Sequence, residues 1–197
     1  MDRDVGYRRK KQPEAVRFAL LECASRLASN HGVGALNLNA VADAAGVTKG
    51  GLYHHFPSKN ALVEALFDNA IVWLDRHIDH SLSTGPQGFG MFTRAYVDIF
   101  LADAVADESP WAALISSVFS DASAIEVWDS WLRQRLEFHS QTDSDPALEI
   151  VRLAADGAWT AITAGFQSAA RDPEDVHRRL ISMIAEVAER LDSKGAS

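Results

Sequence analysis

The chain has 197 residues, 47% of them apolar, and a net charge of −8. This is enough for one sizeable domain or two small ones, and no apolar run approaches the roughly 20 residues of a membrane-spanning helix. A single cysteine, Cys23, excludes an internal disulfide, and the charged start lacks the apolar stretch of a signal peptide, so we expect a cytoplasmic protein without a membrane partner.

The charge is unevenly distributed along the chain. Residues 1–60 hold nine Lys/Arg against five Asp/Glu, a balance of +4, whereas residues 61–197 hold ten against 22, a balance of −12. The first third can approach a polyanion that the remainder would repel. Its basic arm, Tyr7 to Gln12, can lie along phosphates or in a minor groove, or it can be a disordered solubilising tail.

The recurring helix-start signals predict an all-α protein of about nine helices, since nothing reads as a convincing strand. Pro110, Pro146 and Pro173 follow Ser or Asp residues that suit N-caps. The expected helices cover residues 13–30, 38–45, 48–55, 58–82, 89–105, 110–119, 122–140, 146–170 and 173–192.

The second and third predicted helices are short and joined by a tight turn. Asn37 can cap the first of them, Gly46 supplies a left-handed residue that ends it, and Thr48 can cap the next. With the longer helix before them, this order is typical of a helix-turn-helix, whose second helix enters the major groove of DNA.

The segment 46–62, GVTKGGLYHHFPSKNAL, contains residue types that suit a helix bound in the major groove of DNA. Leu52 and Phe56 would face inward, the two glycines would allow close approach to the duplex, and polar side chains would meet phosphates or base edges. The predicted DNA-binding residues are Asn37, Asn39, Thr48, Lys49, Gly50, Gly51, Tyr53, His54 and Lys59.

Residues 36–66, LNLNAVADAAGVTKGGLYHHFPSKNALVEAL, resemble the DNA-binding segment of TetR-type transcriptional regulators. The resemblance implies a DNA-binding domain over 1–57 and a ligand-binding and dimerisation domain over 58–197. It also implies a homodimeric repressor on a palindromic operator in double-stranded DNA, released by a small-molecule effector. A constitutive architectural DNA-binding protein, and a small-molecule carrier or enzyme with a vestigial motif, are the alternatives.

The fourth predicted helix contains His77 and His80 at a spacing of three, which can chelate a metal but more often marks a polar helix face. We find no phosphate loop, nucleophile elbow or zinc-protease motif. We therefore expect no cofactor and no enzymatic activity.

Aromatic residues are concentrated in the second half of the chain, where they suit either core packing or an aromatic-lined ligand pocket. Asp98, Asp103 and Glu108 can favour a cationic ligand or be ordinary surface acids. Otherwise we expect an apolar or aromatic effector, with predicted ligand residues Trp73, Phe92, Tyr96, Phe100, Trp111, Phe119, Trp128, Trp131 and Trp159.

The last two helices suit a homodimer interface. Small residues give one helix a flat face and an aliphatic stripe follows on the other, so two copies can form a four-helix contact. The alternative is an intramolecular core. The predicted interface residues are Ala154, Ala158, Ala161, Gly165, Leu180, Ile184 and Val187.

Overall fold

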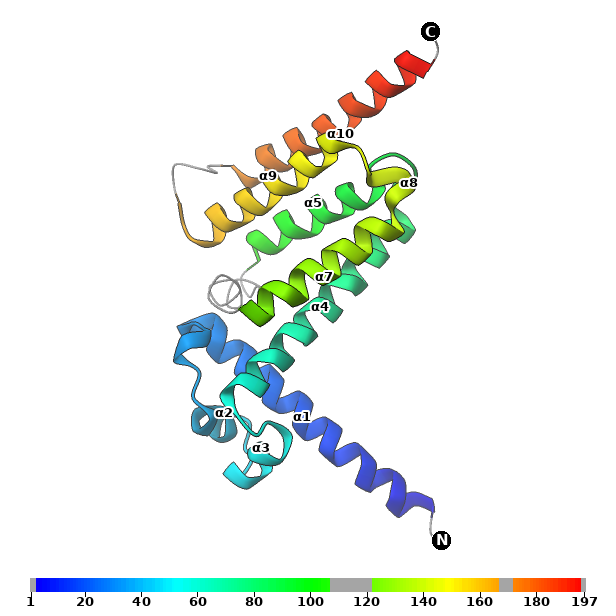
Figure 1. The fold of residues 1–197 in the computed structure, drawn as a ribbon. Coiled ribbons are helices and arrows are strands. Elements are labelled where there is room, and N and C mark those ends of the chain that lie inside the picture. Colours follow the sequence, from blue (N-terminus) through cyan, green and yellow to red (C-terminus); the bar gives the residue numbers. More distant parts are fainter. Residues whose placement is uncertain (1–2, 107–121, 167–171, 196–197) are drawn as a thin grey trace. The chain divides into compact units, whose positions relative to one another are not determined.

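The computed structural model describes residues 3–106, 122–166 and 172–195, which form α-helices, one short 3-10 helix and no strand (Figure 1). The all-α prediction is therefore confirmed for these residues, and the expected helix over 110–119 lies outside them. The elements are α1 (Arg3–His31), η1 (Val33–Ala35), α2 (Leu38–Ala44), α3 (Lys49–His55), α4 (Lys59–Thr84), α5 (Met91–Ala104), α7 (Ala122–Phe138), α8 (Ser140–Asp143), α9 (Pro146–Thr163) and α10 (Pro173–Gly195).

The chain divides into two compact units. The first comprises Met1–Ala70 with Pro110–Ile125, and the second comprises Ile71–Ser109 with Glu126–Ser197. The division falls inside α4, so its first three turns belong with the helix-turn-helix segment rather than with the rest of α4. Among the described residues, no helix is both long and apolar enough to cross a bilayer.

The first unit is built around apolar side chains from α1 to α4, all of them fully buried: Leu20, Ala24, Val41, Ala42, Leu52 and Leu62. The predicted caps shape its turn. The Asn37 side-chain oxygen accepts from the Asn39 N–H at 2.8 Å, and the Thr48 hydroxyl oxygen accepts from the Gly51 N–H at 3.1 Å. Gly46, at φ +65°, has the left-handed conformation that the sequence predicted.

The second unit packs α5, α9 and α10 side by side (Figure 1). Tyr96, Leu148, Trp159 and Ile184 are at most 1% exposed and form its centre. Gly90 precedes α5 at φ +69°, and a Cβ there would lie 2.7 Å from Ile184 Cγ2. Only glycine therefore suits both the backbone and the space at this position.

The carboxylate of Asp143, at the end of α8, caps α5 from 50 residues away in sequence. It is 2% exposed and accepts hydrogen bonds from the Thr93 N–H at 2.8 Å and the Phe92 N–H at 3.2 Å. The Thr93 hydroxyl also donates to it at 2.7 Å and accepts in turn from Arg152 at 2.6 Å. These bonds satisfy amides at the start of α5 that no helical carbonyl can reach.

Replacing Asp143 by alanine should destabilise the protein strongly. The change leaves two buried amides and the Thr93 O–H without their acceptor, so we expect the free energy of unfolding to fall by about 3 kcal/mol. The matched control is Asp129→Ala, which removes an exposed ion pair with Arg133 and should cost less than about 1 kcal/mol. Urea denaturation of both variants measures the difference, and equal losses would contradict this role of Asp143.

Candidate functional site

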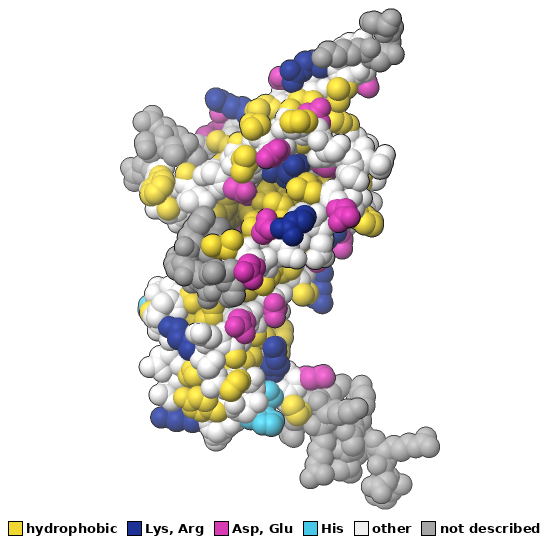
Figure 2. All heavy atoms as spheres, viewed as in Figure 1, with side chains coloured by type: hydrophobic (Ala, Val, Ile, Leu, Met, Phe, Trp, Pro, Cys, Tyr) yellow, Lys and Arg dark blue, Asp and Glu magenta, His cyan; other side chains and the backbone are white. Residues whose placement is uncertain are grey.

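Helix α3 has one buried side and one exposed side, as the sequence predicted. Leu52 and Phe56 are 0% and 2% exposed, whereas Lys49, Tyr53 and His54 are exposed. Figure 2 shows histidine side chains at the surface of the first unit, while many acidic side chains lie over the helices of the second. The exposed side of α3 therefore offers hydrogen-bond donors and one Lys charge to a partner.

Several of the predicted DNA-binding residues also hold the helix-turn-helix together. Asn37 and Thr48 use their side-chain oxygens as caps, which leaves their N–H and O–H groups free to donate to another partner. Lys59 Nζ donates to the Gly34 carbonyl at 2.6 Å and joins the start of α4 to η1. Asn39, by contrast, is exposed on α2.

The structure separates the roles of the two glycines in α3. A Cβ on Gly50 would meet no neighbour within 4 Å, so nothing within the chain requires glycine there. A Cβ on Gly51 would lie 2.9 Å from Val47 Cγ1 and 3.3 Å from the Thr48 hydroxyl that caps the helix. Gly51 therefore has a structural reason within the chain, whereas the described neighbours give none for Gly50.

One residue beside α3 was missed by the sequence reading. The Arg17 guanidinium of α1 lies 5.0 Å from the centre of the Phe56 ring, a cation–π contact between residues 39 positions apart, for which no local sequence signal exists. Partial burial lowers the pKa of His55 from its ordinary value, and the charges of His54 and Arg17 lower it further. This end of α3 is thus next to α1.

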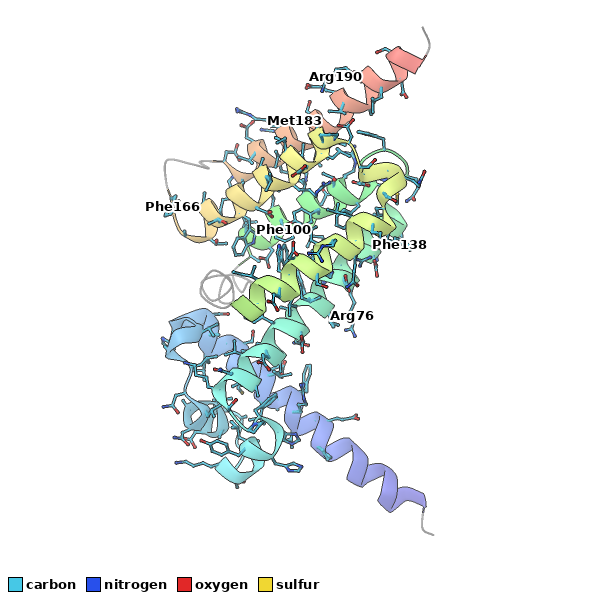
Figure 3. All side chains as sticks on the ribbon, in the orientation of Figure 1. Arg76, Phe100, Phe138, Phe166, Met183 and Arg190 are labelled. Carbon is cyan, nitrogen blue, oxygen red and sulfur yellow. The ribbon has the colours of Figure 1, made fainter. Side chains whose placement is uncertain are left out.

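The second unit brings most of the predicted ligand residues together. Tyr96 stacks on Phe100 at 4.2 Å between ring centres, and Trp128 approaches Phe100 edge-on at 5.8 Å. Phe92 and Trp131 extend the row at its two ends. Figure 3 shows Phe100 on α5. We define these five residues as the aromatic row.

The remaining predicted ligand residues lie elsewhere. The Trp159 indole donates to Asp103 at 2.8 Å in the core, and Trp73 stacks on His77 along α4 at 3.9 Å. Trp111 and Phe119 lie outside the described residues, as does Glu108. His77 Nδ1 donates to the Trp73 carbonyl at 2.7 Å, and the described residues contain no cluster of three or more potential metal ligands.

Polar groups that the sequence did not single out contact the aromatic row. The Tyr96 hydroxyl donates to Asp156 at 2.6 Å, and burial raises the pKa of the Asp156 carboxyl to about 6. Trp131 Nε1 donates to Asp75 on α4 at 2.6 Å, where Arg135 also donates at 2.7 Å. The row is therefore hydrogen-bonded both to α9 and to the second half of α4.

An open groove of about 630 Å³ between the end of α5 and the start of α10 is separate from the aromatic row. It is lined by Asp98, Leu101, Val105 and His177, among others, with His177 Nε2 2.6 Å from an Asp98 oxygen. Asp98, one of the acids considered for a cationic ligand, is thus paired with a histidine.

The predicted dimer residues fall into two groups, those buried within one copy and those exposed on it. Leu180, Ile184 and Val187 are 5%, 0% and 7% exposed within one copy, so they form the intramolecular core that the sequence left as the alternative. Ala161 is also buried, and Gly165, at φ +72°, follows the C-cap of α9 and ends that helix. A second copy has access to Ala154 and Gly165 and, in part, to Ala158.

Two segments of the chain match models of one protein family. Residues 20–66 match the model described as bacterial regulatory proteins of the tetR family, and residues 90–185 match the model described as the tetracyclin repressor-like C-terminal domain. The first match contains α2, α3 and the start of α4. The second extends from α5 into α10.

Curated relatives match over shorter stretches. The chain is 32% identical over 91 residues to the HTH-type transcriptional repressor KstR2 of Mycolicibacterium smegmatis, which is 46% of this chain and 44% of that protein. It is 39% identical over 62 residues to the HTH-type transcriptional regulator TtgR of Pseudomonas putida, 32% of this chain and 30% of that protein. The matched stretches thus span less than half the length of these relatives.

Solved structures share the fold over most of the chain. One is SCO4454, a TetR-family transcriptional regulator from Streptomyces coelicolor, with a TM-score of 0.68 and 20% identity over 89% of this chain and 95% of that one. The SmeT–triclosan complex gives a TM-score of 0.60 and 17% identity, over 85% of this chain and 90% of that one. At these identities the likeness shows the fold alone.

The two glycines of α3 should respond in opposite ways to alanine. Gly50→Ala should raise the free energy of unfolding by up to about 1 kcal/mol, because alanine is the better helix former and meets no neighbour. Gly51→Ala should lower the melting temperature, since its Cβ would push on Val47 and on the Thr48 cap. Thermal unfolding measures both. Stabilisation by both variants would remove the structural reason given for Gly51.

Proposed function

Because the chain belongs to the TetR family of bacterial regulatory proteins, we propose that it is a ligand-responsive repressor that binds a palindromic operator as a homodimer. The observation that carries the proposal is α3, which is fixed to its unit by Leu52 and Phe56 and leaves its polar side exposed. Residues 20–66, which include this helix, match the family model of bacterial regulatory proteins of the tetR family.

Helix α3 is the proposed recognition helix. Its N-terminal residues, Thr48 and Lys49, place unpaired amides and a positive charge where a phosphate or polar base edge binds well. Gly50 allows close approach to the duplex, and Tyr53 and His54 donate to phosphates or base edges from the next turn. Asn39 on α2 can pair with adenine through its amide.

Repression and an effector are proposed with support from the relatives. KstR2 is named a transcriptional repressor, and SmeT was solved as a complex with triclosan. In this chain an apolar or aromatic small molecule would bind at the aromatic row of the second unit. Tyr96 and Phe100 stack on each other and are 0% and 6% exposed, so such a molecule would have to displace rings of the row.

Helix α4 is the proposed connection between effector and operator. It runs without a break from Lys59, whose ammonium holds η1, to Thr84. Asp75, on the same helix, accepts hydrogen bonds from Trp131 of the aromatic row and from Arg135 of α7. An effector that displaces the row would therefore also act on α4. The effector changes operator affinity only if the effector-bound and effector-free conformations of the protein bind the operator unequally.

The exposed side of α9 is the proposed dimer interface. Ile150 and Leu153 are 57% and 59% exposed, and Ala154, Gly157 and Ala158 continue the same stripe at helical spacing. An apolar stripe of this kind marks an interface, and its small residues let two helices approach closely. This face retains Ala154 and Ala158 of the original prediction and replaces the buried aliphatic residues of α10.

The repressor proposal predicts a selective operator. Selection from a random DNA pool should yield a palindrome whose half-sites lie about 34–36 Å apart, or a multiple of one helical turn, bound at least about 1,000-fold more tightly than random DNA. Gly50→Leu should abolish this binding and leave the fold intact, because the added side chain would block approach to the groove. Binding without sequence preference would instead indicate the constitutive architectural protein.

An effector and the operator should weaken each other's binding equally. Compounds that quench tryptophan fluorescence should lower operator affinity about 5- to 150-fold, and operator DNA should lower their affinity by the same factor. Titrations of one such compound with and without operator measure this reciprocity. Equal affinities in the two titrations would show that the compound is not an inducer.

Leu153→Arg should dissociate the dimer without unfolding either copy. Leucine 153 is 59% exposed in one copy, so an arginine there is tolerated alone but would be buried unpaired in the interface. Sedimentation should show folded monomers with weak operator binding. The control, Phe138→Arg, changes an apolar residue on α7 that is 79% exposed (Figure 3) and should stay dimeric. A dimeric Leu153→Arg variant would place the interface elsewhere.

A further inference from the structure

Helix α1 begins ten residues before the position at which the sequence predicted it. It runs from Arg3 to His31, so the segment 3–12, expected to be an arm, has a helical backbone. At about 1.5 Å per residue the whole helix is roughly 43 Å long. We define residues 3–12 as the N-terminal extension.

The part of α1 that follows the extension is barely packed. Pro13, Glu14 and Ala15 are exposed, and the first fully buried side chain of α1 is Leu20. Figure 1 shows the N-terminal turns of α1 extending past α2 and α3. Since burial of an apolar face stabilises most protein helices, Pro13, Glu14 and Ala15 add little of this stability to α1.

The extension is strongly basic. It contains Arg3 and the run Arg8, Arg9, Lys10 and Lys11 against one acid, Asp4, so its net charge is +4. Four consecutive helical positions go once round the axis, so every side of this turn includes a basic position. Basic residues in the N-terminal half of a helix also oppose its dipole.

Two further features make the extension weak on its own. A helix of ten residues is below the length at which isolated helices are stable. Pro13 has no N–H and so cannot donate to the Arg9 carbonyl, which interrupts the ladder between the extension and the rest of α1. A polyanion would offset both the charge repulsion and this low intrinsic stability.

One turn after the extension, α1 lies next to α3. Arg17, one turn after Pro13, lies over the Phe56 ring at the end of α3, and its charge acts on His55. A duplex bound to the exposed side of α3 therefore lies near the path of α1. Phosphates of that same duplex are the closest polyanion available to the basic run.

We propose that the N-terminal extension binds the phosphate backbone of DNA that flanks the half-site read by α3. The inference rests on the proposed function, because α3 brings the duplex to this side of the unit. The contacts are with phosphates, so they add affinity on any sequence and no base preference. An anionic membrane is a poorer partner, because the extension has no continuous apolar face with which to enter it.

The test is a fourfold variant, Arg8→Gln, Arg9→Gln, Lys10→Gln and Lys11→Gln. The slope of log K against log salt concentration should become less steep by about 2 to 4 per half-site. Selected operator and random duplex should lose affinity by the same factor, about tenfold or more at 150 mM salt. An unchanged slope, or a loss confined to the operator, would overturn the proposal.

Two matched controls separate local from overall charge. Exchanging Arg8 and Arg9 for Lys, and Lys10 and Lys11 for Arg, keeps the charge and should keep the slope. The second control neutralises four exposed cations of the second unit, Arg76, Arg133, Arg179 and Arg190. It changes the net charge by as much as the fourfold variant does and should leave the salt slope near that of the unaltered chain. If the slope in this control falls as much as in the fourfold variant, the effect comes from the net charge of the chain and the proposal is overturned.

A second measurement follows the backbone directly. Hydrogen exchange at the amides of residues 7–12 should slow when the unaltered chain binds random duplex, and should not slow on vesicles of anionic lipid. Protection by vesicles and not by DNA would show that the partner of the extension is an anionic membrane, and would overturn the proposal. A chain that binds no duplex at all overturns the proposed function itself, whereas duplex binding with unprotected amides overturns only the extension.

Discussion

The first unit depends on the attachment of α3. A helix of seven residues, two of them glycine, is not stable by itself. It is held by the Thr48 cap, by the buried side chains of Leu52 and Phe56, and by Arg17 against the Phe56 ring. These contacts all lie at the N-terminus of α3 or on its buried side. The exposed side therefore makes none of the contacts that hold the helix in place.

The second unit depends on buried polar groups as much as on its aromatic rings. Asp143 satisfies the start of α5, and Asp156 accepts from Tyr96 in the middle of the same helix. The pKa of Asp156, raised by burial to about 6, means that the native state holds this proton more tightly than the unfolded chain does. Its contribution to stability is complete below about pH 4 and is lost as the pH rises through about 6.

Local signals account for what the sequence predicted well. Asn37, Gly46 and Thr48 fix their turn through contacts within a few residues, and the spacing of Leu52 and Phe56 alone defines one side of α3. Contacts between residues far apart in the sequence were not predicted: Asp143 and Thr93 are 50 positions apart, and Arg17 and Phe56 are 39 positions apart. The stripe through Leu180 and Ile184 correctly indicated burial, yet a stripe cannot say whether the same chain or a second copy covers it. Pro13 suits the first turn of a helix and is disfavoured inside one, so the sequence predicted the start of the helix there and missed the extension.

The uneven charge of the sequence bears on how the chain would meet DNA. An isoelectric point near 5.3 disfavours DNA as a partner for the chain as a whole, yet the first 60 residues carry a balance of +4. Charges more than a Debye length apart, about 8 Å in physiological salt, are largely screened, so a duplex responds to the local surface it meets. In the proposed complex, this local positive balance favours an encounter in which the exposed side of α3 and the basic start of α1 meet the duplex.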